Sequence, residues 1–568
     1  MKDVLCVSDI QLAILFLRIV SLPLDISVLY DPIFVEKIVC LAQHPSVELS
    51  HTIWGCLNFI TNRCPDKSFF TQFKLPTIIL NCWNHFNEQA QVYASDFAPR
   101  IFRDYGTNNE IIRLSLKILP TIQPFEPDSP LLLQVIQLAS AFLTSQVLSS
   151  VSQTLFTFHT IITKTPSSSL NFLSTTLPFF IEDGQPQENP LDNVLLMLLL
   201  ETSTRIESDI KKSHMLTHLR KRRRAFERHR GVRDIVLLNP IESRTFATLS
   251  LEVISLLGVA NGILRLLGTF VYHRGECAQE FINKNLLRAV YHLLQVLQTI
   301  WVPRSDYISE TEARLFSALR SNHLPSEWDA FPELLDESDD GSPLTAEDEL
   351  AEAHFESQMK VDPALLIYNC KDNILQTESE AFFLLANLIS DHSIDAVYAL
   401  HKMAQVELDL DSGIPLSQQE NGATYVPILN LIKSVLETNE NAFGEIIAFL
   451  YPPLFESDVF TMTFIAEGVV ECLFGNASAL MDAMTDKTTA DYVFAMIDRL
   501  LTFSTNFQKI KASEGLSVEN TAYEQLMEAD ILTTLTKMKT YPHLKRKRLI
   551  NDNVELLHKI QFSGGNFS

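Results

Sequence analysis

Apolar residues recur at helical spacing along most of this chain, in short segments separated by polar residues and proline. Residues 32–60 contain two such segments, with apolar side chains at i, i+3 or i+4, and i+7. These side chains are Phe34, Ile38 and Leu41 in the first segment and Ile53, Cys56, Leu57 and Ile60 in the second. The first segment begins at Pro32, and the sequence HPS at 44–46 separates the two. We therefore predict two amphipathic helices joined by a tight connection.

Similar segments follow, and each is predicted to be a helix from the same periodicity. They are residues 76–86, 89–102, 110–122, 130–143, 149–163, 378–390, 426–438 and 463–478. Short amphipathic helices cannot bury their apolar faces alone, so they need neighbours stacked on both sides.

This pattern is typical of an all-α protein, and we predict an armadillo/HEAT-type α-solenoid, a right-handed superhelix of helical repeats. Asn387 and Asn476 lie near the ends of two predicted helices and are 89 residues apart. That distance is about two armadillo or HEAT units of roughly 40–47 residues. A non-repetitive helical bundle domain is the alternative that periodicity leaves open.

Composition agrees with a large helical core. The 568 residues are 46% apolar and include only 17 glycines, which argues against an all-β fold and against glycine-rich phosphate loops. The net charge of −24 disfavours broad binding to nucleic acids or anionic membranes. It would suit a basic partner, or it could simply keep a large helical protein soluble.

Charge divides the chain into segments. Residues 211–233 hold ten basic residues against Glu227 alone, and Glu327 to Glu356 contain no lysine or arginine. We predict a basic segment at 205–244 and an acidic disordered linker at 326–362. Armadillo-like repeats are expected at 1–204 and 363–545, helical repeats at 245–325, and a terminal helix and tail at 546–568.

The sequence indicates a soluble protein of the cytoplasm, the nucleus or both. Eight scattered cysteines with no CxxC pair resemble small buried hydrophobic residues in a reducing compartment. The first residues lack the basic start and cleavage site of a signal peptide. Residues 251–271 are strongly apolar but contain Glu252, Asn261 and Arg265, so we predict a buried helix pair there.

The sequence contains none of the catalytic signatures considered, and we predict no enzyme activity, no cofactor and no metal. It has no phosphate-binding glycine loop, no GxSxG and no HExxH. His214 and His218 are spaced for a metal pair on one helix, but the neighbouring arginines would repel a cation.

One pair of residues indicates binding. Trp54 and Asn58 are four positions apart on a predicted helix and one position away from the apolar pair Ile53/Leu57, so they can project away from the core. An exposed asparagine amide can both donate to and accept from an extended peptide backbone. A tryptophan face attracts lysine and arginine by about 0.5–2 kcal/mol. Spacing alone also allows, and rather favours, a core position for Trp54 and a capping role for Asn58.

Residues 32–60 resemble one armadillo repeat, and HTIWGCLNFIT (51–61) is similar to the third helix of such a repeat in the importin-alpha family. Residues 64–80, 520–538 and 551–560 are similar to further parts of importin-alpha-like arrays. The resemblance implies that Trp54 and Asn58 line a groove for basic peptides of the nuclear localisation type, with Phe383 and Asn387 as a degenerate second slot. The family's ladder of tryptophan–asparagine pairs does not recur here: the residue paired with Asn476 is Cys472.

The arginine-rich segment 220–233 resembles the family's importin-beta-binding region, although in the family that region is N-terminal. Its basic residues are Arg220, Lys221, Arg222, Arg223, Arg224, Arg228, Arg230 and Arg233. It could bind an importin-beta-type receptor, compete with cargo for the chain's own groove, act as a localisation signal, or remain solvated. We therefore expect a non-enzymatic importin-alpha-like adaptor for basic peptides, without nucleic acid or membrane partners. The alternative is a divergent armadillo scaffold of a signalling or ubiquitin-ligase complex with no import role.

Overall fold

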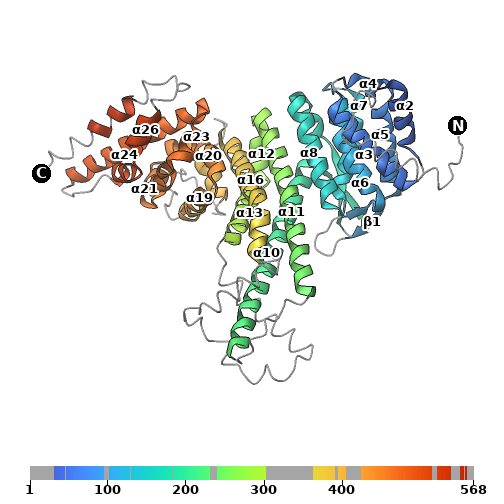
Figure 1. Ribbon diagram of the computed structural model, residues 1–568. Coiled ribbons are helices and arrows are strands. Elements are labelled where there is room, and N and C mark those ends of the chain that lie inside the picture. The colour runs from blue at the N-terminus through green and yellow to red at the C-terminus, as the bar shows by residue number, and fades with distance from the viewer. Residues whose placement is uncertain are drawn as a thin grey trace. The chain divides into compact units, whose positions relative to one another are not determined.

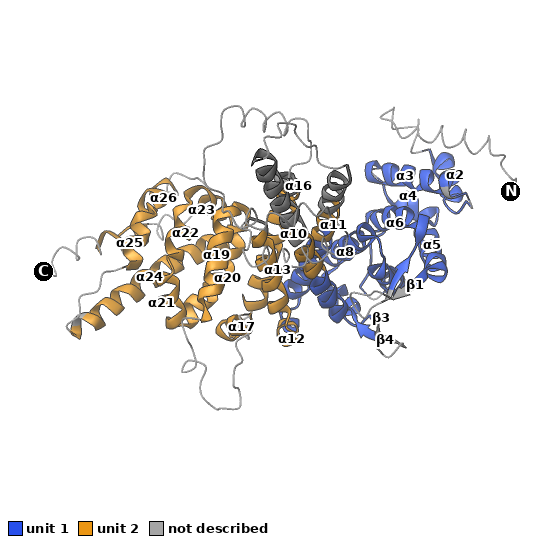
Figure 2. Ribbon diagram, turned by 90° about the horizontal axis from the view of Figure 1, so that it is seen from below, with its two compact units in different colours: residues 1–201, 258–277 blue, residues 202–257, 278–568 orange. Residues whose placement is uncertain are grey.

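The computed structural model describes residues 31–301, 363–403, 424–538 and 551–559, with gaps at 45, 65, 95–100, 128, 183–184, 230–239, 391–394, 515–520 and 556. Within these ranges the chain is mostly helical, as predicted (Figure 1). It forms two compact units: unit 1 comprises residues 1–201 and 258–277, and unit 2 comprises 202–257 and 278–568 (Figure 2). The predicted segment 245–325 is therefore divided between the units.

Unit 1 contains a row of helices in which α3, α6 and α8 lie side by side, with α5 and α7 packed on them as a second layer. Ser150 Oγ lies 3.2 Å from Asn109 Oδ1, and Lys164 Nζ donates to Pro120 O at 2.7 Å. These bonds join the starts and the ends of α6 and α8, so the two helices run parallel. The helices are α2 (Pro32–Leu41), α3 (Val47–Arg63), α4 (Ser68–Gln72), α5 (Leu75–Gln89), α6 (Asn109–Ile122), α7 (Pro130–Ser140), α8 (Leu148–Lys164) and α9 (Ser169–Leu173).

The predicted helix at 89–102 is wrong. This part of the chain contains β1 (Gln91–Ala94) and β2 (Ile101–Asp104), paired antiparallel with Gln91 opposite Asp104. Val92 and Tyr93 favour strands, and Pro99 disfavours a continuous helix. A second hairpin pairs β3 (Thr176–Glu182) with β4 (Gln185–Pro190).

Two long helices belong partly to each unit. The backbone of α10 (Leu191–His229) passes the predicted boundary at 204/205 without a break, and α11 (Pro240–His273) contains the strongly apolar stretch. Residues Leu251–His273 are long and apolar enough to cross a membrane, but 67% of their most apolar window lies buried in the protein. The predicted burial of this stretch is confirmed. The predicted helix pair is wrong, because one continuous helix runs through Gly258 and Gly262.

Gly262 allows α11 to approach α8 closely. A Cβ atom placed at Gly262 would lie 2.9 Å from Leu155 Cβ, an atom that cannot move without the α8 backbone. We expect Gly262→Ala to lower the free energy of unfolding by about 1–3 kcal/mol, because the two helices would have to separate. Gly55→Ala is the matched control, since nothing lies within 4 Å of its Cβ position. It should be neutral or stabilising by up to about 1 kcal/mol. Urea denaturation followed by circular dichroism measures both, and equal effects would contradict the close contact.

Unit 2 repeats the arrangement of parallel rows. One row runs α13, α16, α20, α24, and a second runs α19, α22, α25, with each helix packed against the next in its row. The bounds are α12 (Ala278–Asn283), α13 (Leu286–Trp301), α16 (Pro363–Ser390), α17 (Ala396–Met403), α19 (Val426–Thr438), α20 (Phe443–Glu456), α21 (Asp458–Ala466), α22 (Val469–Gly475), α23 (Ala477–Ala483), α24 (Lys487–Ser513), α25 (Thr521–Glu528) and α26 (Ile531–Met538).

A residue with a left-handed backbone conformation (positive φ) recurs between a short helix and the helix that follows it. Lys74, Asn285, Gly468 and Asp530 have φ of 57°, 63°, 70° and 51°, and they join α4–α5, α12–α13, α21–α22 and α25–α26. The residues four before, one after and five after each of them are buried and apolar. In chain order these are Phe70, Leu75 and Ile79; Phe281, Leu286 and Val290; Phe464, Val469 and Leu473; and Leu526, Ile531 and Leu535. Within the described residues, the same helix–turn–helix unit therefore occurs four times, and both compact units contain it.

The predicted helix at 463–478 is broken, because it contains one of these junctions. Gly468 separates α21 from α22, and Asn476 lies at the start of α23, where its side chain accepts from Ala479 N. Asn387, in contrast, lies inside α16. The two asparagines therefore do not occupy equivalent positions of a repeat. Their spacing of 89 residues does not measure the length of two repeat units.

Candidate functional site

Trp54 is fully buried, with 0% of its surface exposed. Its indole Nε1 donates to Ala42 O at 3.2 Å, an oxygen that also accepts from Ser50 Oγ at 3.1 Å. The core position that the spacing favoured for Trp54 is confirmed, and the alternative that it projects away from the core is wrong. Its ring presents no face to a peptide in this structure. Asn58 is half-buried, and its Oδ1 accepts from Asn62 Nδ2 at 3.1 Å.

The burial of Trp54 follows from the neighbours of α3. This helix packs against α2 and against α6, so its buried surface extends over a wider arc than the Ile53/Leu57 stripe indicates. Trp83, the other tryptophan spaced four residues before an asparagine, is also buried and donates to Ser115 Oγ at 2.8 Å. Both tryptophans of unit 1 therefore stabilise the core.

The second predicted slot lies at the surface of unit 2. Phe383 and Asn387 are both half-exposed on α16, one turn apart, and Asn387 Nδ2 donates to Phe383 O at 2.8 Å. Because that bond uses only an amide hydrogen, the Asn387 side-chain oxygen can still accept from a ligand. Glu380 lies one turn before Phe383 on the same stripe of the helix.

The solvent stripe of α16 is adjacent to that of α20. Phe382 and Phe449 pack edge to face below the surface, with ring centroids 5.9 Å apart. Burial, followed by the charge of Glu380, raises the pKa of the Glu445 carboxyl above its usual value. Two carboxylates on neighbouring helices thus lie close enough to repel each other.

Aromatic rings extend this surface to α24. Tyr451 on α20 stacks on Tyr492 of α24, with ring centroids 4.3 Å apart and planes inclined by 22°. Arg499 Nε donates to Leu454 O at 3.0 Å, which holds α24 parallel to α20. We call the half-exposed residues Glu380, Phe383 and Asn387 of α16, Glu445 and Tyr451 of α20, and Tyr492 of α24 the acidic face.

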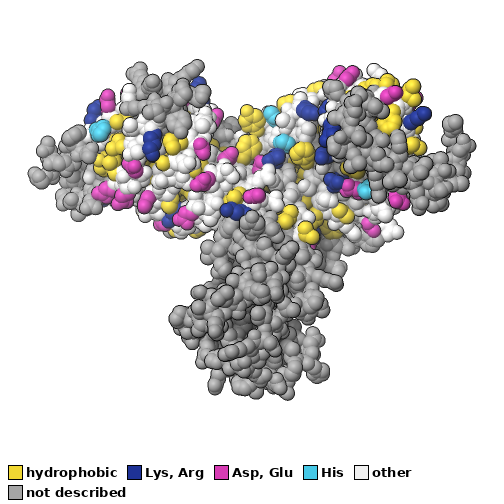
Figure 3. Space-filling model, viewed as in Figure 1, with side chains coloured by type: hydrophobic (Ala, Val, Ile, Leu, Met, Phe, Trp, Pro, Cys, Tyr) yellow, Lys and Arg dark blue, Asp and Glu magenta, His cyan; other side chains and the backbone are white. Residues whose placement is uncertain are grey.

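The acidic face belongs to an acidic part of the chain. Residues 426–538 contain 16 aspartates and glutamates against six lysines and arginines. Acidic side chains also dominate the charged positions of α19 to α24 in the view of Figure 3. This excess of carboxylates attracts cations and basic peptides.

Several predictions concern residues that the structure does not describe. The helix α10 includes residues 220–229, but its side chains are described only as far as Ile210, and Arg230 and Arg233 lie outside the described residues. The acidic segment 326–362 also lies outside them, as do the side chains of His214 and His218. Within the described residues, no group of three or more His, Cys, Asp or Glu side chains is placed to hold a metal ion.

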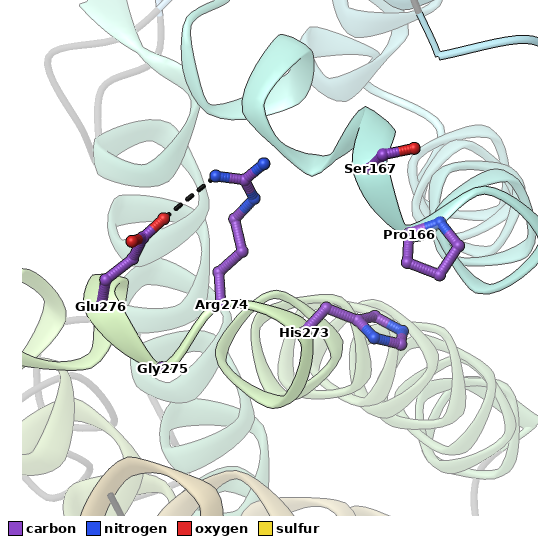
Figure 4. Close-up of a pocket in the computed structure, with 6 residues that line it drawn as sticks. All are labelled: Pro166, Ser167, His273, Arg274, Gly275 and Glu276. Carbon is purple, nitrogen blue, oxygen red and sulfur yellow. Dashed lines mark hydrogen bonds and ion pairs between the residues drawn. The ribbon is translucent and has the colours of Figure 1, made fainter.

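Unit 1 also has a shallow recess, of about 340 Å³, where α8 and α11 end (Figure 4). It is lined by Pro166, Ser167, His273, Arg274, Gly275 and Glu276. The Arg274 guanidinium pairs with Glu276 at 3.0 Å and donates to Ser169 Oγ at 3.3 Å. Because Glu276 neutralises the charge of Arg274, the recess offers little to an anionic ligand.

Comparison with known proteins adds no family. No protein family and no curated protein matches the sequence. Among solved structures, an engineered protein determined by the Northeast Structural Genomics Consortium aligns with 98% of this chain and 96% of its own. It is 10% identical, with a TM-score of 0.38. A TM-score of this size does not establish a common fold.

Proposed function

We propose that this chain is a non-enzymatic, protein-binding helical-repeat protein of the armadillo/HEAT type, and that its acidic face holds basic segments of partner proteins. Two features support a repeat architecture: the parallel rows in each unit and the four left-handed junctions. In repeat proteins of this kind, adjacent parallel helices present a continuous binding surface.

The observation that carries the proposal is the half-buried stripe of Glu380, Phe383 and Asn387 on α16, which lies beside the helix α20 that carries Glu445. Two neighbouring carboxylates raise each other's free energy, and a lysine or arginine placed between them would relieve it. The Phe383, Tyr451 and Tyr492 rings offer flat surfaces to the aliphatic part of such a side chain. Asn387 adds a group that can bind the peptide backbone. The acidic face therefore combines the elements that the sequence predicted for Trp54 and Asn58, but in unit 2.

In its more specific form, the proposal is an importin-alpha-like adaptor that binds peptides of the nuclear localisation type. Phe383 and Asn387 support it, and the buried Trp54 argues against the other predicted slot. A receptor of the importin-beta type would then bind the basic residues of 220–233. The alternative, a scaffold of a signalling or ubiquitin-ligase complex, uses the same face for a basic segment of another subunit.

The test is fluorescence anisotropy with a labelled lysine-rich peptide and the double variant Glu380→Gln/Glu445→Gln. We expect the variant to bind about tenfold more weakly, because two partly desolvated carboxylates lose their charge. Asp482→Asn/Glu528→Gln is the matched control, since it removes two exposed charges on α23 and α25, outside the acidic face. Equal loss in the two double variants would mean that only the overall charge attracts the peptide.

The pH dependence of binding of the lysine-rich peptide measures the contribution of Glu445. A bound cation lowers the pKa of this carboxyl from its raised value, so binding releases a proton while free Glu445 is still partly protonated. The affinity of the wild type should therefore increase as the pH rises above the ordinary glutamate value of 4.5. The single variant Glu445→Gln should lose most of that increase. An adaptor for import would in addition prefer a nuclear localisation peptide over its scrambled sequence, whereas a scaffold would not.

A further inference from the structure

Unit 1 carries a surface of the opposite charge. Its helices α6 and α8 run parallel, joined by the bond from Thr157 Oγ1 to Leu116 O at 3.0 Å. The second half of α11 continues the row, since Ser152 Oγ donates to Gly258 O at 3.2 Å. Each of the three helices has one stripe of residues open to solvent, and the rest of its surface is buried. The three stripes form one surface.

The charges on these helices are mainly positive. Residues 109–122, 148–164 and 258–273 contain four cations, Arg113, Lys117, Lys164 and Arg265, and a single carboxylate, Glu110. Glu110 pairs with Arg113. The exposed Lys117 makes no ion pair within the described part of the chain. In the view of Figure 3, lysine and arginine side chains gather over α8. In a chain of net charge −24, this local excess does not follow from composition.

Burial and nearby positive charges lower the pKa values of two residues on this surface. Burial, followed by the charge of Lys67, lowers the pKa of the Lys164 ammonium. Burial, followed by the charge of Arg265, lowers the pKa of His159 to about 4, so this imidazole is neutral at pH 7. A bound anion would relieve the repulsion between Lys164 and Lys67, as a cation would between the carboxylates of the acidic face.

An exposed aromatic ring lies on the same surface. Phe156, on the solvent stripe of α8, is 50% exposed and lies one turn before His159 and Thr160. A large apolar side chain among cations fits a ligand that has both apolar groups and negative charge.

We propose that Arg113, Lys117, Phe156, Lys164 and Arg265 form a cationic face that binds an acidic segment of a partner protein. The proposal is independent of the one for the acidic face. A nucleic acid fits less well, because the four cations are spread over three helices and one of them, Arg113, is already paired with Glu110. The chain's net charge would also repel a longer polyanion.

The test measures anisotropy of a labelled peptide of alternating glutamate and serine, with a glutamine–serine peptide as the uncharged control. We expect the acidic peptide to bind at low salt and the glutamine peptide not to bind. Lys117→Glu should weaken binding about tenfold, because it reverses an exposed charge of the cationic face. Phe156→Ser should weaken binding of a version of the peptide that carries leucines. Lys37→Glu, an equal charge reversal at an exposed position of α2, should change the affinity less than about twofold.

Three results would overturn the proposal: equal binding of the glutamine peptide, equal effects of Lys117→Glu and Lys37→Glu, or tighter binding of a single-stranded oligonucleotide than of the acidic peptide. Lys117 and Phe156 are exposed, so thermal unfolding should show that both variants fold as the wild type does. The Glu380→Gln/Glu445→Gln variant should bind the acidic peptide unchanged. A failure here is therefore distinguishable from a failure of the proposed function.

Discussion

Trp54→Ala is expected to lower the free energy of unfolding of unit 1 by about 3–5 kcal/mol, among the largest effects of any single substitution in this chain. The side chain is fully buried, and its removal leaves a cavity between α3 and its neighbours. It also removes the indole bond to Ala42 O. Urea denaturation followed by circular dichroism measures the loss without relying on tryptophan fluorescence.

Two further variants separate packing from hydrogen bonding at this position. Trp54→Phe should cost less than Trp54→Ala, because the ring fills much of the space and Ala42 O still accepts from Ser50 Oγ. Phe156→Ala, a truncation of an exposed aromatic ring, should change stability by less than about 0.5 kcal/mol. If Trp54→Ala instead left stability unchanged and abolished binding of a basic peptide, Trp54 would be a surface residue and the burial described above would be wrong.

The second large effect is expected from Glu378→Ala, at about 3 kcal/mol or more. Glu378 on α16 has no exposed surface. Its carboxylate accepts from Gln298 Nε2 at 2.8 Å and from Asn439 Nδ2 at 3.0 Å. Asn439 is itself fully buried, so the substitution leaves two donors without these acceptors in the core of unit 2.

Glu380→Ala is the matched control for Glu378→Ala, because it lies two residues along the same helix but on the solvent stripe. It should be neutral or slightly stabilising, since it removes a charge that repels Glu445. The same denaturation experiment compares the two variants. Similar losses would show that the α16 backbone, and not the buried carboxylate, is sensitive to alanine.

The helices themselves could largely be predicted from the sequence. Residues 32–41 and 47–63 are separated as expected by the HPS break, and Ser46 caps the second helix by accepting from Leu49 N. The long periodic segments at 110–122, 149–163 and 426–438 correspond closely to α6, α8 and α19. Errors arose where the local signal was short. The segment 89–102 is a hairpin, and the stretch 463–478 bends at the left-handed Gly468.

The sequence alone determined the helical class, most helix positions and the sign of each charged segment, because helical periodicity, caps and composition act over a few neighbouring residues. It also contained the stripe Glu380–Phe383–Asn387, which lies on a single helix. Only the tertiary structure decided which stripes meet. Trp54 became buried because α2 and α6 cover two sides of α3. Glu380 acquired its neighbour Glu445, 65 residues later in the chain, because α20 packs beside α16. A binding face is made by residues that are distant in sequence, and packing between helices brings them together.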